Sequence, residues 1–221
     1  MIAKKRTWFY KGYFGFIKGR TSQFRDYVLE IESKFSHDLK SLEKRHEKEI
    51  RQKGTDAEFE DYLTDFYAEE FHRIDRIFLR TFRYSAVVTI YSLLETSMNS
   101  LCSILKQMKG INIELEEIRG DGIERAKVYL KKACGIKFPE RSHAWSELQK
   151  LNKIRNCIIH AEGDIWRTHS PTKLNNILKN TKGLALENDQ YLLIEKKFLE
   201  DAITWAEDFL QELHENSFPD K

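Results

Sequence analysis

The chain has 221 residues, of which 41% are hydrophobic, 12% aromatic and 33% charged, and its formal net charge is +2. This length suits one domain with room for an appendage, and the apolar content supports a hydrophobic core. With 3 Pro and 10 Gly, the composition favours a helical, highly charged soluble protein. No apolar run approaches the length of a membrane span, and the basic, aromatic N-terminus is unlike a signal peptide. We therefore expect a cytoplasmic protein that does not bind a membrane.

The three cysteines, Cys102, Cys134 and Cys157, are odd in number, widely separated and without the spacing of zinc ligands. We therefore expect reduced thiols, as in the cytosol, and neither a disulfide framework nor a metal site. The chain also lacks a glycine-rich phosphate loop and a histidine pair with a glutamate between them, so no cofactor is expected.

Charge is distributed unevenly along the chain. Residues 1–20 contain six Lys or Arg and no acidic residue, whereas the remainder, with 31 basic and 35 acidic residues, sums to −4. Residues 145–182 hold seven Lys or Arg against three acids, and the chain turns acidic after Gly183. A basic zone beside an acidic one fits a protein that binds a polyanion locally rather than along its whole surface.

Residues 7–16, TWFYKGYFGF, interleave aromatic residues with glycine in the basic N-terminal stretch. One interpretation is an arm whose rings stack on the bases of single-stranded nucleic acid while lysines follow the phosphates. The other, which we favour, is an arm that packs on the helical body or on a second subunit.

Three longer helices are predicted next. A narrow apolar seam with steps of three or four residues predicts a helix over 24–50 that suits packing against another helix. Gly54 separates it from a second helix over 56–79, and a third, strongly apolar helix is predicted over 81–108. The predicted core side of the second helix consists of Phe59, Tyr62, Leu63, Phe66, Ile74, Ile77 and Phe78.

The second half of the chain contains shorter elements. Ser142 is the expected N-cap of a helix from His143 to Ala161. The other predicted elements are a short helix over 123–134, a short helix near 172–180, a hairpin of strands 184–186 and 191–194, and a final amphipathic helix that includes residues 198–213.

The stretch 151–163, LNKIRNCIIHAEG, ends the predicted helix over 143–161. Asn156 and His160 are four residues apart and share one face of this helix, while Arg155 lies off that face but has a side chain long enough to reach round. Gly163 is placed to end the helix as a left-handed cap. The apolar stripe predicted to be buried comprises Leu151, Ile154, Ile158 and Ile159.

Arg155, followed directly by Asn156 and then by His160 at the end of an apolar helix, resembles the Arg-x4-His motif of the HEPN superfamily. The layout of residues 57–215, with a short β-element before a terminal helix, is similar to that family too. The resemblance implies an all-α, HEPN-like up-and-down helical bundle, with a long N-terminal helical extension and a small β-hairpin near the C-terminus. Residues 1–54 would form the arm and long helix, and residues 55–221 the HEPN-like domain.

The resemblance also implies a function. HEPN domains include metal-independent endoribonucleases, hydrolases of toxin–antitoxin and phage-defence systems that act on single-stranded RNA. Carried over, this makes Arg155, Asn156 and His160 the catalytic residues. The family forms dimers, so we expect a homodimer whose two motif helices face each other across one cleft. Glu95, in an apolar neighbourhood of the helix over 81–108, is either a solvated residue or one that orients Arg155 or His160.

These residue types suit the cleavage of RNA, which carries its own nucleophile, the 2′-hydroxyl. Imidazole transfers protons near neutral pH, and guanidinium pairs with two phosphate oxygens while it stays charged. Neither role requires a metal. Lys150, Lys153 and Arg167 lie near the motif in the sequence and are candidate RNA contacts.

Two alternatives belong to other classes of protein. One is a non-catalytic HEPN-like protein that binds nucleotides or RNA, or a partner such as a protein inhibitor or a nucleotidyltransferase-type protein. The other is a helical scaffold in which the helix over 24–50 is the working surface and the motif merely packs. The joint presence of Arg, Asn and His favours the ribonuclease over the binding protein, and Asn156 beside Arg155 favours both over the scaffold.

Overall fold

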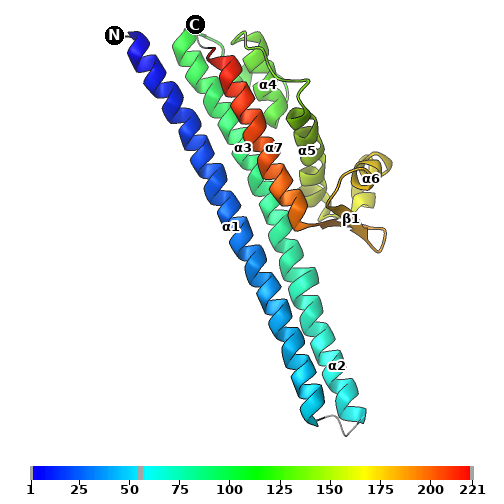
Figure 1. Cartoon of the computed structure of the whole chain (residues 1–221). Coiled ribbons are helices and arrows are strands. Elements are labelled where there is room, and N and C mark those ends of the chain that lie inside the picture. Colours follow the sequence, from blue (N-terminus) through cyan, green and yellow to red (C-terminus); the bar gives the residue numbers. More distant parts are fainter. Residues whose placement is uncertain (1, 54–56, 220–221) are drawn as a thin grey trace.

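The computed structural model describes residues 2–53 and 57–219, with side chains described over 12–52 and 58–219. Two long helical segments run antiparallel and form the spine of the molecule (Figure 1). The first is α1 (Ile2–Lys53). The second is a continuous rod of α2 (Ala57–His72), the π-helical segment η1 (Arg73–Leu79) and α3 (Arg80–Lys109).

The body of the molecule forms where further helices pack on α3. These are α4 (Gly122–Lys132), α5 (His143–Ala161) and α7 (Lys196–Ser217), with a short 3-10 turn η2 (Leu115–Glu117) ahead of α4. Helix α7 contacts α1, α3 and α5. The aromatic centre of the core is Trp145, whose ring lies 4.9 Å from that of Phe138 and 5.0 Å from that of Phe209.

A small subassembly projects from the body at the end of α5 (Figure 1). It contains the 3-10 turn η3 (Ile165–Arg167), α6 (Pro171–Lys179) and a hairpin of β1 (Leu184–Glu187) and β2 (Tyr191–Ile194). The strands pair antiparallel with Leu184 opposite Ile194, so the predicted hairpin and its position before the last helix are confirmed.

Away from the body, α1 and α2 continue as a two-helix arm, which we define as residues 35–52 with 58–79. Its core is a thin cluster centred on Leu42, Leu63 and Tyr67. The predicted core side of this second helix was partly wrong, because a helix facing a single neighbour buries only one stripe. The side chains expected inside but found exposed are Tyr62, Phe66, Ile77 and Phe78.

The N-terminal segment is helix rather than an irregular arm, so the predicted start near Phe24 was wrong. Tyr13 donates a hydrogen bond to the Ser97 carbonyl at 2.5 Å, and Phe14 stacks on His214 with ring centroids 5.3 Å apart. These contacts with α3 and α7 agree with the packing interpretation for residues 13 and 14. The side chains of residues 7–11, which belong to the same predicted arm, lie outside the described residues.

The predicted break between the second and third helices does not occur. Residues 73–79 form a π-helical segment, and Leu79 and Arg80 at its end keep right-handed helical angles. The wider π turn shifts the helical phase without ending the helix, so one rod serves both the arm and the body.

The architecture is therefore mostly helical with one small antiparallel hairpin near the C-terminus. The helical stretch Glu58–Lys109 contains an 18-residue window with a mean hydropathy of 1.2, long and apolar enough to cross a membrane, and 33% of that window is buried inside the protein. Core helices commonly meet the same criterion, and α3 buries Val87, Leu94 and Leu105 completely in the body. The expectation that no apolar segment approaches the length of a membrane span was therefore wrong, although this helix is only weak evidence for such a span.

Candidate functional site

The motif helix α5 begins and ends where the sequence predicts. The Ser142 hydroxyl accepts a hydrogen bond from the Trp145 N–H at 3.1 Å and caps the first turn. At the other end, Glu162 and Gly163 both have positive φ, 52° and 84°. A Cβ atom on Gly163 would clash with the Tyr84 hydroxyl, so both the close contact and the positive φ require glycine at this position.

The chain after α5 is held to the hairpin by Asp164. This buried carboxylate accepts hydrogen bonds from the Trp166 N–H at 2.9 Å and from the Gln190 side chain at 2.8 Å. The Gln190 bond is the main cause that lowers the pKa of Asp164, and the backbone N–H groups of Trp166 and Arg167 act in the same direction. The Trp166 indole donates to the Asp189 carbonyl at 2.8 Å. These bonds position the segment that follows, up to α6.

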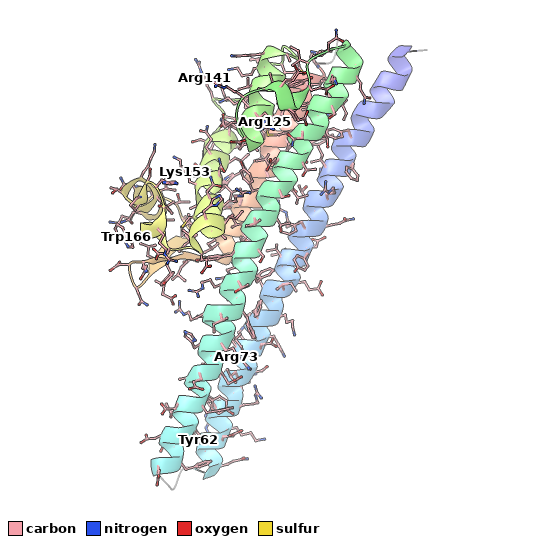
Figure 2. The ribbon with its side chains drawn as sticks, turned by 180° about the vertical axis from the view of Figure 1, so that it is seen from behind. Tyr62, Arg73, Arg125, Arg141, Lys153 and Trp166 are labelled. Carbon is pink, nitrogen blue, oxygen red and sulfur yellow. The ribbon has the colours of Figure 1, made fainter. Side chains whose placement is uncertain are left out.

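A groove of about 560 Å3 lies between the C-terminal half of α5 and the segment from η3 to the start of α6. In Figure 2, Lys153 is labelled at α5, and Trp166 is labelled lower in the view, beside α6 and the hairpin. The α5 wall consists of Lys153, Asn156, Cys157, His160 and Ala161. The opposite wall consists of Arg167, Thr168, His169, Ser170, Lys173 and Leu174.

The lining of this groove is basic. It contains Lys153, Arg167 and Lys173 together with two histidines, and none of its lining residues is acidic. Such a surface favours a phosphate or another polyanion. Cys157 lies in the lining but is 1% exposed, and burial, with Asp164 nearby, raises its pKa to about 11. Its thiol therefore stays protonated at neutral pH and is a poor nucleophile.

Arg155 lies outside the groove lining, on the side of α5 that meets α3. Its guanidinium is 5.3 Å from the centre of the Tyr91 ring, and its Nε is buried without a hydrogen-bond partner among the described residues. Its Nη1 donates to the Asn156 Oδ1 at 2.8 Å. The structure therefore brings Asn156 and His160 into one groove and links Arg155 to it through the Asn156 amide.

Glu95 is not among the residues that line the groove. A Cβ on Gly122 would come within 3.2 Å of the Tyr91 hydroxyl and 3.6 Å of Glu95 Oε1, so both groups meet the start of α4. Burial, with the Glu95 carboxylate, raises the pKa of Tyr91 to about 12, and Arg155 opposes the rise. Among the described residues, no hydrogen bond or ion pair joins Glu95 to Arg155 or His160.

The candidate RNA contacts divide in the structure. Lys153 and Arg167 line the groove, whereas Lys150 is paired with the Glu147 carboxylate at 2.7 Å and is absent from the lining. Sequence reasoning missed His169 and Lys173. The sequence pattern Ser170-Pro171, an N-cap followed by proline at the first helical position, could have indicated them. It places His169 and Lys173 at the start of a helix.

In the described parts of the chain, no group of three or more His, Cys, Asp or Glu side chains is arranged to hold a metal ion. Comparisons of this chain with known protein families, with curated proteins and with solved structures found no match.

Proposed function

We propose that this protein is a metal-independent endoribonuclease of the HEPN type that acts on single-stranded RNA, as a toxin or phage-defence effector. The observation that supports it most is the acid-free groove in which Asn156 and His160 meet Lys153, Arg167 and Lys173. A cationic groove with an imidazole in its wall has what the cleavage of a phosphodiester by its neighbouring 2′-hydroxyl requires.

In this proposal the groove residues have two roles, phosphate binding and proton transfer. Lys153, Lys173 and Arg167 bind the phosphates of the RNA strand, and His160 transfers a proton at the cleaved phosphate. The Asn156 Oδ1 is occupied by Arg155, which leaves its NH2 group to donate to the substrate. Arg155 then acts as a positioning residue for Asn156 in the arrangement seen here.

The proposal includes a homodimer in which the motif helices face each other. Ile159 is the residue of α5 that supports it, because this isoleucine is 42% exposed although the sequence pattern predicted it to be buried. A second motif helix packed beside this one would cover the Ile159 side chain and remove its apolar surface from water. Sedimentation of wild type and Ile159→Asp tests this: we expect a dimer for the wild type and a monomer for the variant.

One observation favours the alternative, a HEPN-like protein that binds RNA without cutting it. Arg155 stacks on Tyr91 instead of facing the groove, so its charge is directed away from a bound phosphate. In that case the groove binds nucleotides or RNA while His160 only contributes to binding.

The deciding experiment incubates purified protein with a labelled single-stranded RNA in excess EDTA. We expect cleavage that leaves 2′,3′-cyclic phosphate ends and a loss of about 10²–10⁴-fold in rate for His160→Ala. Lys153→Ala should weaken RNA binding and lower its dependence on salt. The matched control is His143→Ala, an exposed histidine at the other end of α5.

The possible results separate the three classes of function. Binding in the groove without cleavage supports the non-catalytic protein, and absence of both leaves the helical scaffold. Equal cleavage by wild type and His160→Ala contradicts the proposed role of the motif histidine. Circular dichroism of each variant shows whether a loss reflects misfolding.

A further inference from the structure

The groove brings together two histidines from separate elements of one chain. His160 belongs to the last turn of α5, and His169 lies in the segment between η3 and α6 on the opposite wall. Both side chains are exposed to solvent, and both line the groove. The resemblance to HEPN domains concerns only His160, so the second imidazole is a feature of this fold that the motif does not account for.

The wall that carries His169 is held in place from several directions. Asp164 anchors the start of the segment to Gln190 and to the Trp166 N–H, and Thr168 donates a hydrogen bond to the Ile165 carbonyl at 2.7 Å. Pro171 restrains the backbone directly after Ser170. The backbone that carries His169 is therefore held in a fixed position relative to α5, as proton transfer to a bound substrate requires.

The two rings come from different elements and face the groove from opposite walls. His160 is in the last turn of α5, and His169 precedes the first residue of α6 by two positions. Imidazoles on opposite walls can act on opposite sides of one bound phosphate, one as proton acceptor and the other as proton donor.

We infer that His169 is a second catalytic residue, the general base of a two-histidine site contained within one chain, with His160 as the general acid. The inference rests on the proposed ribonuclease function and extends it to the source of the second imidazole. A homodimer would then not be needed to supply a second His160.

The proposed step is balanced without a cofactor. His169 takes the proton of the 2′-hydroxyl as the O2′–P bond forms, and the P–O5′ bond breaks as His160 gives its proton to the leaving O5′. The products are a 2′,3′-cyclic phosphate and a 5′-hydroxyl. Lys153, Lys173 and Arg167 are the cations that neutralise the charge on phosphorus-bound oxygens in the groove.

The test compares His160→Ala and His169→Ala on two substrates in excess EDTA. On polyuridine, both variants should lose about 10²–10⁴-fold in kcat/KM, because each lacks one proton-transfer group. On uridine 3′-(4-nitrophenyl phosphate), the leaving group departs without a proton. There His160→Ala should recover most of its rate and His169→Ala should not. The pH–rate profile on this second substrate separates a general base from a structural residue. Loss of the base removes the acidic limb of the profile, whereas a structural loss lowers the rate at every pH and keeps that limb.

The results distinguish this inference from the proposed function. If the wild type leaves polyuridine intact, the ribonuclease function itself fails. If the wild type cuts it and His169→Ala cuts it equally well, only the role of His169 fails.

Mixing the two single variants tests whether one chain holds both groups. Each chain in the mixture lacks one ring, so the mixture should stay as inactive as its parts. Restored cleavage would show that the two rings act across a subunit interface, and would overturn the assignment to one chain. His143→Ala, with wild-type rates on both substrates, is the control for removal of an exposed histidine.

Discussion

The body and the two-helix arm are built from the same helical rod, yet they differ in how much of it they bury. In the body, α3 lies against α4, α5 and α7, and Val87, Leu94 and Leu105 are fully buried. In the arm, the continuation of the rod packs mainly on α1, and its buried cluster consists of Leu63 and Tyr67 against Leu42.

This difference determines where a site can form. In the body, α5, η3 and the start of α6 form a groove of about 560 Å3, and the hairpin holds η3 in place. The cavity between the arm helices is smaller, about 360 Å3, and lies between α1 and the α2–η1 segment. The two antiparallel helices of the arm leave aromatic rings such as Tyr62 and Phe78 exposed to solvent. We therefore expect substitutions in the body to affect folding and function together, and those in the arm to act locally.

The largest effect is expected from Trp145→Ala, which removes the central ring of the body. Trp145 is 1% exposed and packs on Phe138 and Phe209, so its loss leaves a cavity that should cost about 3–5 kcal/mol of unfolding free energy. Urea unfolding followed by circular dichroism measures this. RNA binding in the groove should weaken in parallel, because α5 carries both Trp145 and the groove wall.

Leu42→Ala is the counterpart in the arm, at a residue equally buried. Hydrogen exchange of the arm amides should accelerate while that of α5 stays as in the wild type, because the arm can open without the body. Equal acceleration in α5 would contradict this expectation and show that arm and body unfold as one cooperative unit.

The next effect concerns the junction where α1 leaves the body for the arm. Glu32 is 6% exposed, and its two oxygens accept hydrogen bonds from the Arg83 guanidinium at 2.7 and 2.8 Å. Arg83 also donates to the Ile194 carbonyl at 2.8 Å, which ties α1, α3 and β2 together. Arg83→Ala leaves Glu32 buried without its partner and should cost about 3 kcal/mol.

The matched control for Arg83 is Arg25, which joins α1 to α7 through Glu207 at 2.6 Å but is partly open to solvent. Arg25→Ala should cost less than about 1 kcal/mol, because solvent screens such a pair. Thermal unfolding of both variants and of Glu32→Ala/Arg83→Ala gives the comparison. Similar losses for Arg83→Ala and Arg25→Ala would mean that burial of the Glu32 pair does not strengthen the junction.

Sequence-based prediction was more accurate for the body than for the arm. Helix α5 was predicted from His143 to Ala161 because Ser142 and Gly163 are local signals that act within one turn of the helix ends. The hairpin was predicted for a similar reason, since turn residues separate two short apolar runs. The arm was predicted poorly because apolar side chains occur on both sides of α2, and only the position of α1 decides which side is buried.

The site was predicted in part. Asn156 and His160 share the groove because four residues make about one helical turn, whereas Arg155 is about 140° from His160 around the helix and stacks on Tyr91. The Arg155 side chain is long enough to reach towards His160, but the contact with Tyr91 of α3 depends on tertiary packing and could not be predicted from the local sequence. His169 and Lys173 depend on how the segment after α5 folds back, which is a tertiary contact.

The smallest effect is expected on the outer face of the arm, from Tyr62→Ser. Tyr62 is 63% exposed, so its replacement should change the unfolding free energy by no more than about 0.5 kcal/mol. The control is Tyr67→Ser, five residues further along the same helix. Tyr67 is 3% exposed, and its ring centroid lies 4.6 Å from that of His46. Its loss should therefore accelerate hydrogen exchange of the arm amides markedly. Hydrogen exchange of both variants provides the measurement. A loss above about 1 kcal/mol for Tyr62→Ser would mean that this ring is covered in solution. A partner molecule would then bury the outer face of the arm, as the body's own helices bury α3.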